Sequence, residues 1–216
     1  MAVLYVALLV TAGLAGAPVS RKFPIATAVA FGLVAVFSLL QLTVAPALYE
    51  ALRRDRAAIA GGELWRLVTS FVVQDSGWPG TIFNLVTLAV IGTLAERRWG
   101  TVRWIGLALV VQVLGDLWGL VVYPVGAGTS LVNFGLAASL AAAALLGEPD
   151  RRRRLAAAVS LVVALVLLVL GDIHGGAAVL GALGGAALAR LEVSRPGPRS
   201  GAPGRFRRVP RWPSGR

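Results

Sequence analysis

The chain has 216 residues, of which 57% are hydrophobic and 14% are charged. A soluble domain of this length could not bury so much apolar surface, so the composition predicts a polytopic membrane protein. The formal net charge of +11 comes almost entirely from arginines grouped between apolar runs. This pattern is typical of cytoplasmic loops and argues against a nucleic-acid-binding protein. With no cysteine and one histidine, disulfides are excluded, and we expect neither a metal site nor a cofactor.

Seven apolar segments follow one another and predict an all-α bundle of membrane helices. Several of them approach the roughly 20 residues needed to cross a hydrocarbon core. The segments cover 2–16, 23–48, 79–95, 102–123, 128–146, 155–170 and 174–191. We expect residues 1–22 to form an extra N-terminal transmembrane helix and residues 23–192 to form a six-helix membrane domain. Residues 193–216 are rich in Pro, Gly, Ser and Arg and predict a disordered basic tail.

The basic residues predict how the chain is oriented. They follow the first, third, fifth and seventh segments, so the positive-inside rule places these connections and the C-terminus in the cytoplasm, with the N-terminus outside. Four arginines in the loop 49–78 weaken this assignment. The first segment also admits an interpretation as a signal peptide, but no basic residue precedes it and two follow it. We therefore expect an uncleaved helix, in an integral protein of a bacterial plasma membrane.

Ser130 and His174 begin the fifth and seventh segments, at what this orientation makes the extracytoplasmic end. A serine alcohol is too weakly acidic to attack an amide unaided, and a neutral imidazole can accept its proton. His174 is the only histidine available for that role. Taken alone, each residue has a plainer explanation, because serines in membrane helices bond their own backbone and a histidine near a helix start can simply be solvated.

Several motifs, taken together, resemble the rhomboid family of intramembrane serine proteases. They are 62–70 (GELWRLVTS), 83–85 (FNL), 96–100 (ERRWG), 128–136 (GTSLVNFGL) and the glycine-rich segment that begins at His174. Their order and spacing from about residue 23 to residue 191 imply a six-helix rhomboid core behind the extra helix. Trp65 and Arg66 match the family's first-loop motif, although an interfacial tryptophan and a headgroup contact would explain them equally.

The resemblance implies a Ser130–His174 dyad that cleaves transmembrane helices near the extracytoplasmic face. If Ser130 lies in the first turn of a helix, the free N–H groups of that turn can stabilise a developing oxyanion. The side-chain amide of Asn84 can donate to the same oxyanion, and Gly128 lets the substrate approach closely. Phe134 follows Ser130 by one helical turn and is expected to pack against the imidazole.

Two departures from the family pattern favour a second interpretation. Leu131 stands where a glycine usually follows the nucleophile, and Gly80 replaces a histidine that would donate to the oxyanion. Losing one such donor costs about 10²- to 10³-fold in turnover. The alternative is a catalytically inactive rhomboid-fold protein that binds transmembrane clients. A less favoured third interpretation, a transporter or channel, rests on Gln112 and Asp116 at membrane depth.

The expected partners are single-pass membrane substrates and the lipid bilayer, with no nucleic acid. By resemblance, a substrate helix enters beside the fifth core helix, residues 155–170.

Overall fold

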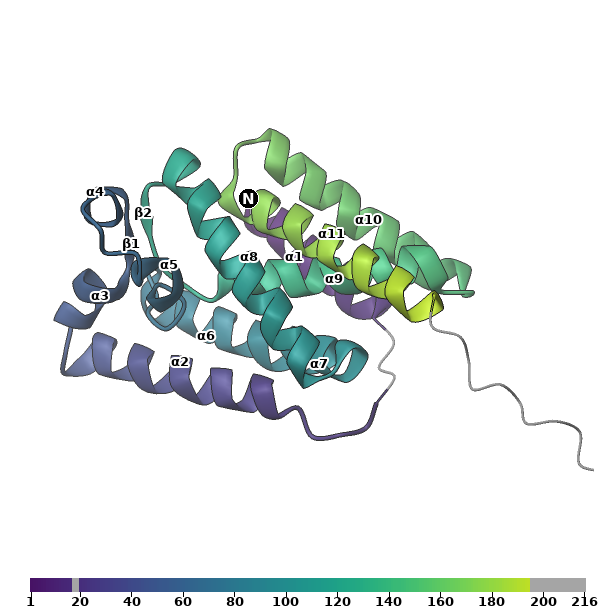
Figure 1. The fold of residues 1–216 in the computed structure, drawn as a ribbon, viewed down its shortest axis with the longest axis horizontal. Coiled ribbons are helices and arrows are strands. Elements are labelled where there is room, and N and C mark those ends of the chain that lie inside the picture. The colour runs from purple at the N-terminus through teal and green to yellow at the C-terminus, as the bar shows by residue number, and fades with distance from the viewer. Residues whose placement is uncertain (17–19, 195–216) are drawn as a thin grey trace, which may run out of the picture.

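The computed structural model describes residues 1–16 and 20–194, which form a bundle of helices (Figure 1). The elements are α1 (Ala2–Ala15), α2 (Ile25–Thr43), α3 (Ala47–Leu52), β1 (Arg54–Asp55), α4 (Arg56–Ala60), α5 (Arg66–Thr69), α6 (Gly77–Thr87), the π-helix η1 (Leu88–Gly92), α7 (Thr93–Trp99), α8 (Thr101–Val122), β2 (Val125–Gly126), α9 (Ser130–Gly147), α10 (Arg151–Val169) and α11 (Ile173–Val193). The predicted all-α membrane bundle is confirmed. The predicted tail lies outside the described residues from position 195 onward.

Four of the described helices are long and apolar enough to cross a membrane. They are α2, the continuous rod Gly77–Trp99, α8 and α9. The first helix, α1, has 14 residues and is about 21 Å long, shorter than a hydrocarbon core of about 30 Å. Four arginines open α10 and leave it a shorter apolar stretch. The count of six core helices plus one, and the division at residues 22 and 192, therefore stay predictions.

The centre of the bundle is α9. Every residue from Leu131 to Ala144 is buried, because α1, α8, α10 and α11 all pack against this helix. A helix that is apolar on all sides and small in its side chains suits such a position. The start of α9 is therefore held from several directions, and Ser130 is its first residue.

The long connection between α2 and α6 is a folded element on one side of the bundle (Figure 1). Its strand β1 pairs with β2 in antiparallel register, with Arg54 opposite Gly126. The guanidinium of Arg66 donates to the backbone carbonyls of Glu50 and Arg53, at 2.7 and 3.0 Å. The Arg66 bonds hold the first loop together, and the β1–β2 pairing ties it to the loop that precedes α9.

The opposite end of the bundle is held by a buried carboxylate. Glu96 of α7 accepts hydrogen bonds from the backbone N–H groups of Ala26 and Thr27, at 3.0 and 2.8 Å. These are first-turn donors of α2, whose own N-cap, Pro24, makes no side-chain hydrogen bond. Glu96 thus caps a neighbouring helix, which gives a physical role to the acidic residue of the 96–100 motif.

The extra helix α1 lies against α10, α9 and η1. Ser160 of α10 donates to the backbone carbonyl of Leu8 at 3.1 Å, and both residues are fully buried. The helix therefore lies beside α10 on the flank of α9 and touches the rod Gly77–Trp99 at η1. Its N-terminal end reaches the level at which α9 and α11 begin.

Candidate active site

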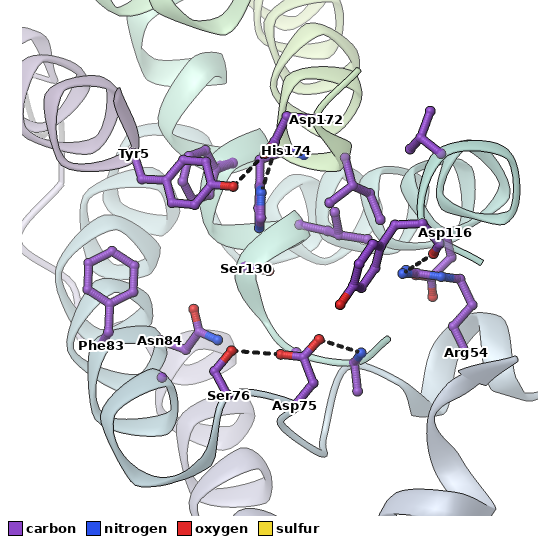
Figure 2. Close-up of a pocket in the computed structure, with 18 of the residues that line it drawn as sticks. Tyr5, Arg54, Asp75, Ser76, Phe83, Asn84, Asp116, Ser130, Asp172 and His174 are labelled. Carbon is purple, nitrogen blue, oxygen red and sulfur yellow. Dashed lines mark hydrogen bonds and ion pairs between the residues drawn. The ribbon is translucent and has the colours of Figure 1, made fainter. Parts of the chain in front are cut away.

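A cavity of about 460 Å³ lies at the end of the bundle where α9 and α11 begin. Its lining includes five of the residues singled out from the sequence, namely Ser130, His174, Asn84, Gly128 and Phe134. Figure 2 shows the His174 ring projecting toward the start of α9, with Asn84 on the far side of Ser130. Trp65 and Arg66 do not line this cavity. Arg66 is buried in the first loop, and Trp65 is 54% exposed on its surface.

The glycines of α11 bring Ser130 and His174 to the same level. A Cβ atom at Gly181 would lie 2.0 Å from the carbonyl oxygen of Gly135, and one at Gly185 would lie 2.4 Å from that of Ser139. Both contacts advance by four residues in each helix, so α9 and α11 run in the same direction in backbone contact. Ser130 and His174 lie one to two turns before these contacts on their helices, and both line the cavity.

Replacing Gly181 with alanine should push α11 away from α9. The new Cβ would collide with backbone, which cannot rotate aside, so we expect a loss of roughly 1–3 kcal/mol in the free energy of unfolding. Unfolding in mixed micelles with increasing SDS measures this loss. The matched control is Gly184→Ala, where the new Cβ meets only the flexible end of Leu107. Equal stability of the two variants would contradict the proposed backbone contact.

The helix that carries Ser130 begins without a side-chain cap. Thr129 is its N-cap residue and makes no capping hydrogen bond, whereas Asp150 and Asp172 cap α10 and α11. The first-turn N–H groups of α9 are therefore left without a side-chain acceptor. Gly128 precedes them with a φ of +139°, a conformation that favours glycine. This arrangement leaves N–H donors for an anionic oxygen at the cavity.

Asn84 completes the same wall of the cavity. A methyl group placed on Gly128 would lie 3.3 Å from Asn84 Nδ2 and 3.8 Å from Ser130 Oγ, so these two atoms flank one small space. Asn84 Nδ2 donates to Gln74 Oε1 at 2.7 Å, which leaves its second hydrogen free. Gln74 is itself fixed, because Gln41 bonds both its backbone N–H and its carbonyl.

Gln74 was not identified from the sequence. It lies in the first loop, outside the apolar segments, and is 1% exposed. A polar side chain in a loop normally signals solvent contact, so its burial beside Asn84 depends on the tertiary fold. In the structure it is a positioning residue for the Asn84 amide.

Three side chains surround His174. Its Nδ1 lies 2.7 Å from Asp172 Oδ1. The ring centroids of Phe134 and Tyr5 each lie 4.6 Å from the imidazole centroid. The Tyr5 hydroxyl donates to Asp172 Oδ2 at 2.5 Å. Asp172 also accepts the backbone N–H of His174 at 2.9 Å, and this bond caps α11.

The sequence offered no signal for Tyr5. It is the one aromatic residue of a short apolar helix, and it lies 167 positions before Asp172 in the chain. The Nδ1 contact of Asp172 was also missed, because a residue two positions before a histidine suggests a cap first. The charge of this carboxyl is supported by its surroundings. Burial raises the pKa of Asp172, but the hydrogen bonds from His174 and Tyr5 outweigh burial and hold the pKa below its usual value.

Ser130 and His174, both within the described residues, are not joined by a hydrogen bond. They share the cavity, and the Nδ1 atom of the imidazole is engaged by Asp172. Catalytic hydrogen bonds are often long in a free enzyme and shorten when the substrate binds. The arrangement thus leaves Nε2 as the imidazole atom open to the cavity.

The two departures from the family pattern both have neighbours that accommodate them. Leu131 is 3% exposed, and its side chain meets α8 at Gly115, where a Cβ would lie 3.3 Å from Leu131 Cδ1. At Gly80, a Cβ would lie 2.2 Å from Ser76 Cβ. A side chain at position 80 would therefore require the loop at Ser76 to move. The observed conformation of this loop depends on the glycine at position 80.

Asp116 has a structural explanation that the transporter interpretation lacked. Its carboxylate forms a buried ion pair with Arg54 and accepts hydrogen bonds from Ser70 Oγ at 2.6 Å and Gln112 Nε2 at 2.9 Å. Arg54 and Ser70 come from the first loop, and Gln112 lies one turn before Asp116 on the same helix. Ser70 also accepts the backbone N–H of Gly128 at 2.9 Å. The pair therefore holds the loop that precedes Ser130.

Two comparisons with known proteins identify the family of this chain. The model of the Rhomboid domain matches residues 61–195. Rhomboid protease GluP of Bacillus subtilis (strain 168) is 33% identical over 93 residues, which cover 43% of this chain and 18% of the relative. The match with GluP thus spans less than a fifth of that protein. The residues that line the cavity fall within the matched region, except those of the first helix and the first strand. The chain belongs to the rhomboid family of integral membrane proteins.

Proposed function

We propose that this protein is an intramembrane serine endopeptidase that uses Ser130 as the nucleophile and His174 as the general base. One observation carries the proposal. The only histidine of the chain and the serine at the uncapped start of α9 line one cavity, with the Asn84 amide beside them. A nucleophile, a base and oxyanion donors are what acyl transfer requires. The substrates would be single-pass membrane proteins.

The reaction would proceed in two steps. Ser130 Oγ attacks the scissile carbonyl while His174 Nε2 accepts the hydroxyl proton, and the oxyanion is bound by the α9 N-terminus and Asn84. His174 then returns the proton to the leaving amine, which yields an acyl-enzyme and one peptide product. Water attacks the ester with the same imidazole as base, and Ser130 is regenerated.

The placement in the membrane follows from charge. Because arginines cluster at the far ends of α7 and α11 and at the start of α10, we place those ends in the cytoplasm and the cavity near the extracytoplasmic face. A bacterial plasma membrane, with the N-terminus outside, fits this arrangement. Cleavage would then occur where a substrate helix meets the outer leaflet.

The test uses the full chain in proteoliposomes with a panel of single-pass substrates. We expect wild-type protein to cleave at least one of them and a fluorophosphonate probe to label Ser130. If no substrate is cleaved and the probe does not react, the inactive client-binding alternative replaces the protease. Leu131 and Gly80, where the chain departs from its family, are the reasons to take this alternative seriously.

Asn84→Ala should lower kcat by about 10²- to 10³-fold, because it removes an oxyanion donor. KM should change little, since the donor acts mainly in the transition state. Initial rates in proteoliposomes measure both constants. Thr81→Val is the control on the same helix, because the Thr81 hydroxyl bonds only its own backbone at Gly77. If kcat of Asn84→Ala stays within a few fold of wild type, Asn84 does not act as an oxyanion donor.

We expect the substrate helix to enter by a different route from the one beside α10 that the family resemblance implies. Because α1 packs along α10 and reaches η1, a helix entering there would have to displace α1. The cavity is also lined by Phe83 of α6, which is 39% exposed. We infer that the substrate approaches between α1 and α6.

Photo-crosslinking tests this route. Benzoylphenylalanine at position 83 should capture a bound substrate, whereas the same group at Leu165, exposed on α10, should not. The crosslinked products are identified by gel shift and mass spectrometry. Capture from position 165 alone would restore the route beside α10.

A further inference from the structure

The bonds around His174 extend beyond a serine–histidine pair. Asp172 Oδ1 lies 2.7 Å from Nδ1 of the imidazole and also accepts the His174 backbone N–H. Two bonds to one oxygen fix the carboxylate against the start of α11. A carboxylate accepts hydrogen bonds and cannot donate one, so the ring nitrogen that faces it must carry a proton. The lone pair of the imidazole is then on Nε2, which is the nitrogen that can serve Ser130.

The second oxygen of the carboxylate is held by the extra helix. Tyr5 of α1 donates its hydroxyl to Asp172 Oδ2. Its ring also packs on the imidazole at 4.6 Å between centroids and meets Phe134 edge-on at 5.2 Å. Figure 2 shows the phenol and the imidazole converging on the Asp172 carboxylate from two helices. Tyr5 therefore touches both the base and the group that orients the base.

We propose that Asp172 and Tyr5 are positioning residues that hold His174 with its proton on Nδ1, so that α1 is an integral part of the catalytic site. The inference rests on the proposed function of Ser130 and His174. Tyr5 lies outside residues 61–195 that match the Rhomboid domain, so the family match does not supply this role. The helix α1 reaches the site through Tyr5, which contacts Asp172 and His174 at the start of α11 and Phe134 of α9.

The experiment uses the fact that the chain has one histidine. Full-length protein, labelled with ¹⁵N-histidine and purified through a tag without histidine, gives a single imidazole spin system in detergent micelles. We expect the neutral imidazole to carry its proton on Nδ1, with Nε2 bare. Asp172→Asn keeps the helix cap, because asparagine caps as well as aspartate. The amide oxygen that caps the helix is an uncharged and weaker acceptor for Nδ1–H, so the Nδ1–H proton signal should move upfield and the tautomer population should shift toward Nε2–H. This spectrum is read without any substrate, so it decides the inference even if the chain proves to be inactive.

Kinetics give the second readout. Asp172→Asn should lower kcat by roughly 10²- to 10⁴-fold with little change in KM. Tyr5→Phe keeps the ring and loses the hydroxyl, and should lower kcat by about 10-fold. The control is Thr11→Val, which removes a hydroxyl of α1 that bonds only Ala7 and Leu8 of its own helix.

The two halves of the inference fail separately. An unchanged Nδ1–H signal and a kcat within twofold of wild type in Asp172→Asn would overturn the role of Asp172. An unchanged Nδ1–H signal and a kcat within twofold of wild type in Tyr5→Phe would overturn the role of α1. If wild type cleaves nothing but shows the expected tautomer and its shift in Asp172→Asn, the positioning is upheld and the protease proposal fails.

Discussion

Replacing either Ser130 or His174 with alanine is expected to reduce cleavage of a transmembrane substrate by roughly 10⁶-fold, to below detection in most assays. Ser130→Ala removes the atom that forms the acyl-enzyme. His174→Ala removes the single imidazole of the chain, the side chain whose ordinary pKa suits a general base and acid near neutral pH. Initial rates in proteoliposomes and fluorophosphonate labelling measure the two losses.

A double variant tests whether Ser130 and His174 act together. Because the two residues act as one unit, Ser130→Ala combined with His174→Ala should lose no more activity than either single change. Thr43→Ala serves as the control, since its hydroxyl is exposed and bonds only the Leu39 carbonyl of its own helix. Losses that multiply in the double variant would mean that the serine and the histidine act independently, which contradicts a nucleophile and its base.

The positions of the helices were well predicted from hydropathy, whereas the helices of the first loop were not. The segment 102–123 became α8 (Thr101–Val122), and 128–146 became α9 (Ser130–Gly147). The short helices α3, α4 and α5 have too few residues for a periodic pattern to show. Their order depends on contacts such as those of Arg66 with distant carbonyls.

The residues of the candidate site also fall into two groups, those that the sequence predicted and those that it did not. Ser130, His174, Asn84 and Phe134 belong to recognisable motifs, and all four line the cavity. Supporting residues such as Tyr5 and Gln74 carry no such pattern, because a hydrogen bond between distant segments leaves no mark on spacing. The parallel contact of α9 and α11 was predictable only in part. The glycine-rich segment after His174 was identified as part of a motif, but only the structure shows that Gly181 and Gly185 pack against Gly135 and Ser139.

The second large effect is expected at the buried ion pair of the first loop. Asp116→Asn should lower the free energy of unfolding by about 3–5 kcal/mol, because it leaves a buried guanidinium without its counter-charge. Arg54 is 3% exposed, and Asp116 is fully buried. Unfolding with SDS in mixed micelles measures the change. The control is Glu50→Gln, which removes the exposed carboxylate of a pair with the half-buried Arg53 and should cost less than about 1 kcal/mol.

The same change should also impair catalysis, through the loop that carries Gly128. Asp116 accepts the Ser70 hydroxyl, and the Ser70 carbonyl accepts the Gly128 N–H, so a loosened pair frees the turn before Ser130. The variant Arg54→Met with Asp116→Leu separates charge from packing. An apolar pair of similar volume is often as stable as a buried ion pair, so the double variant should regain most of the lost stability. If it stays as unstable as Asp116→Asn, the unpaired charge is not the cause, and the hydrogen bonds to Ser70 and Gln112 are.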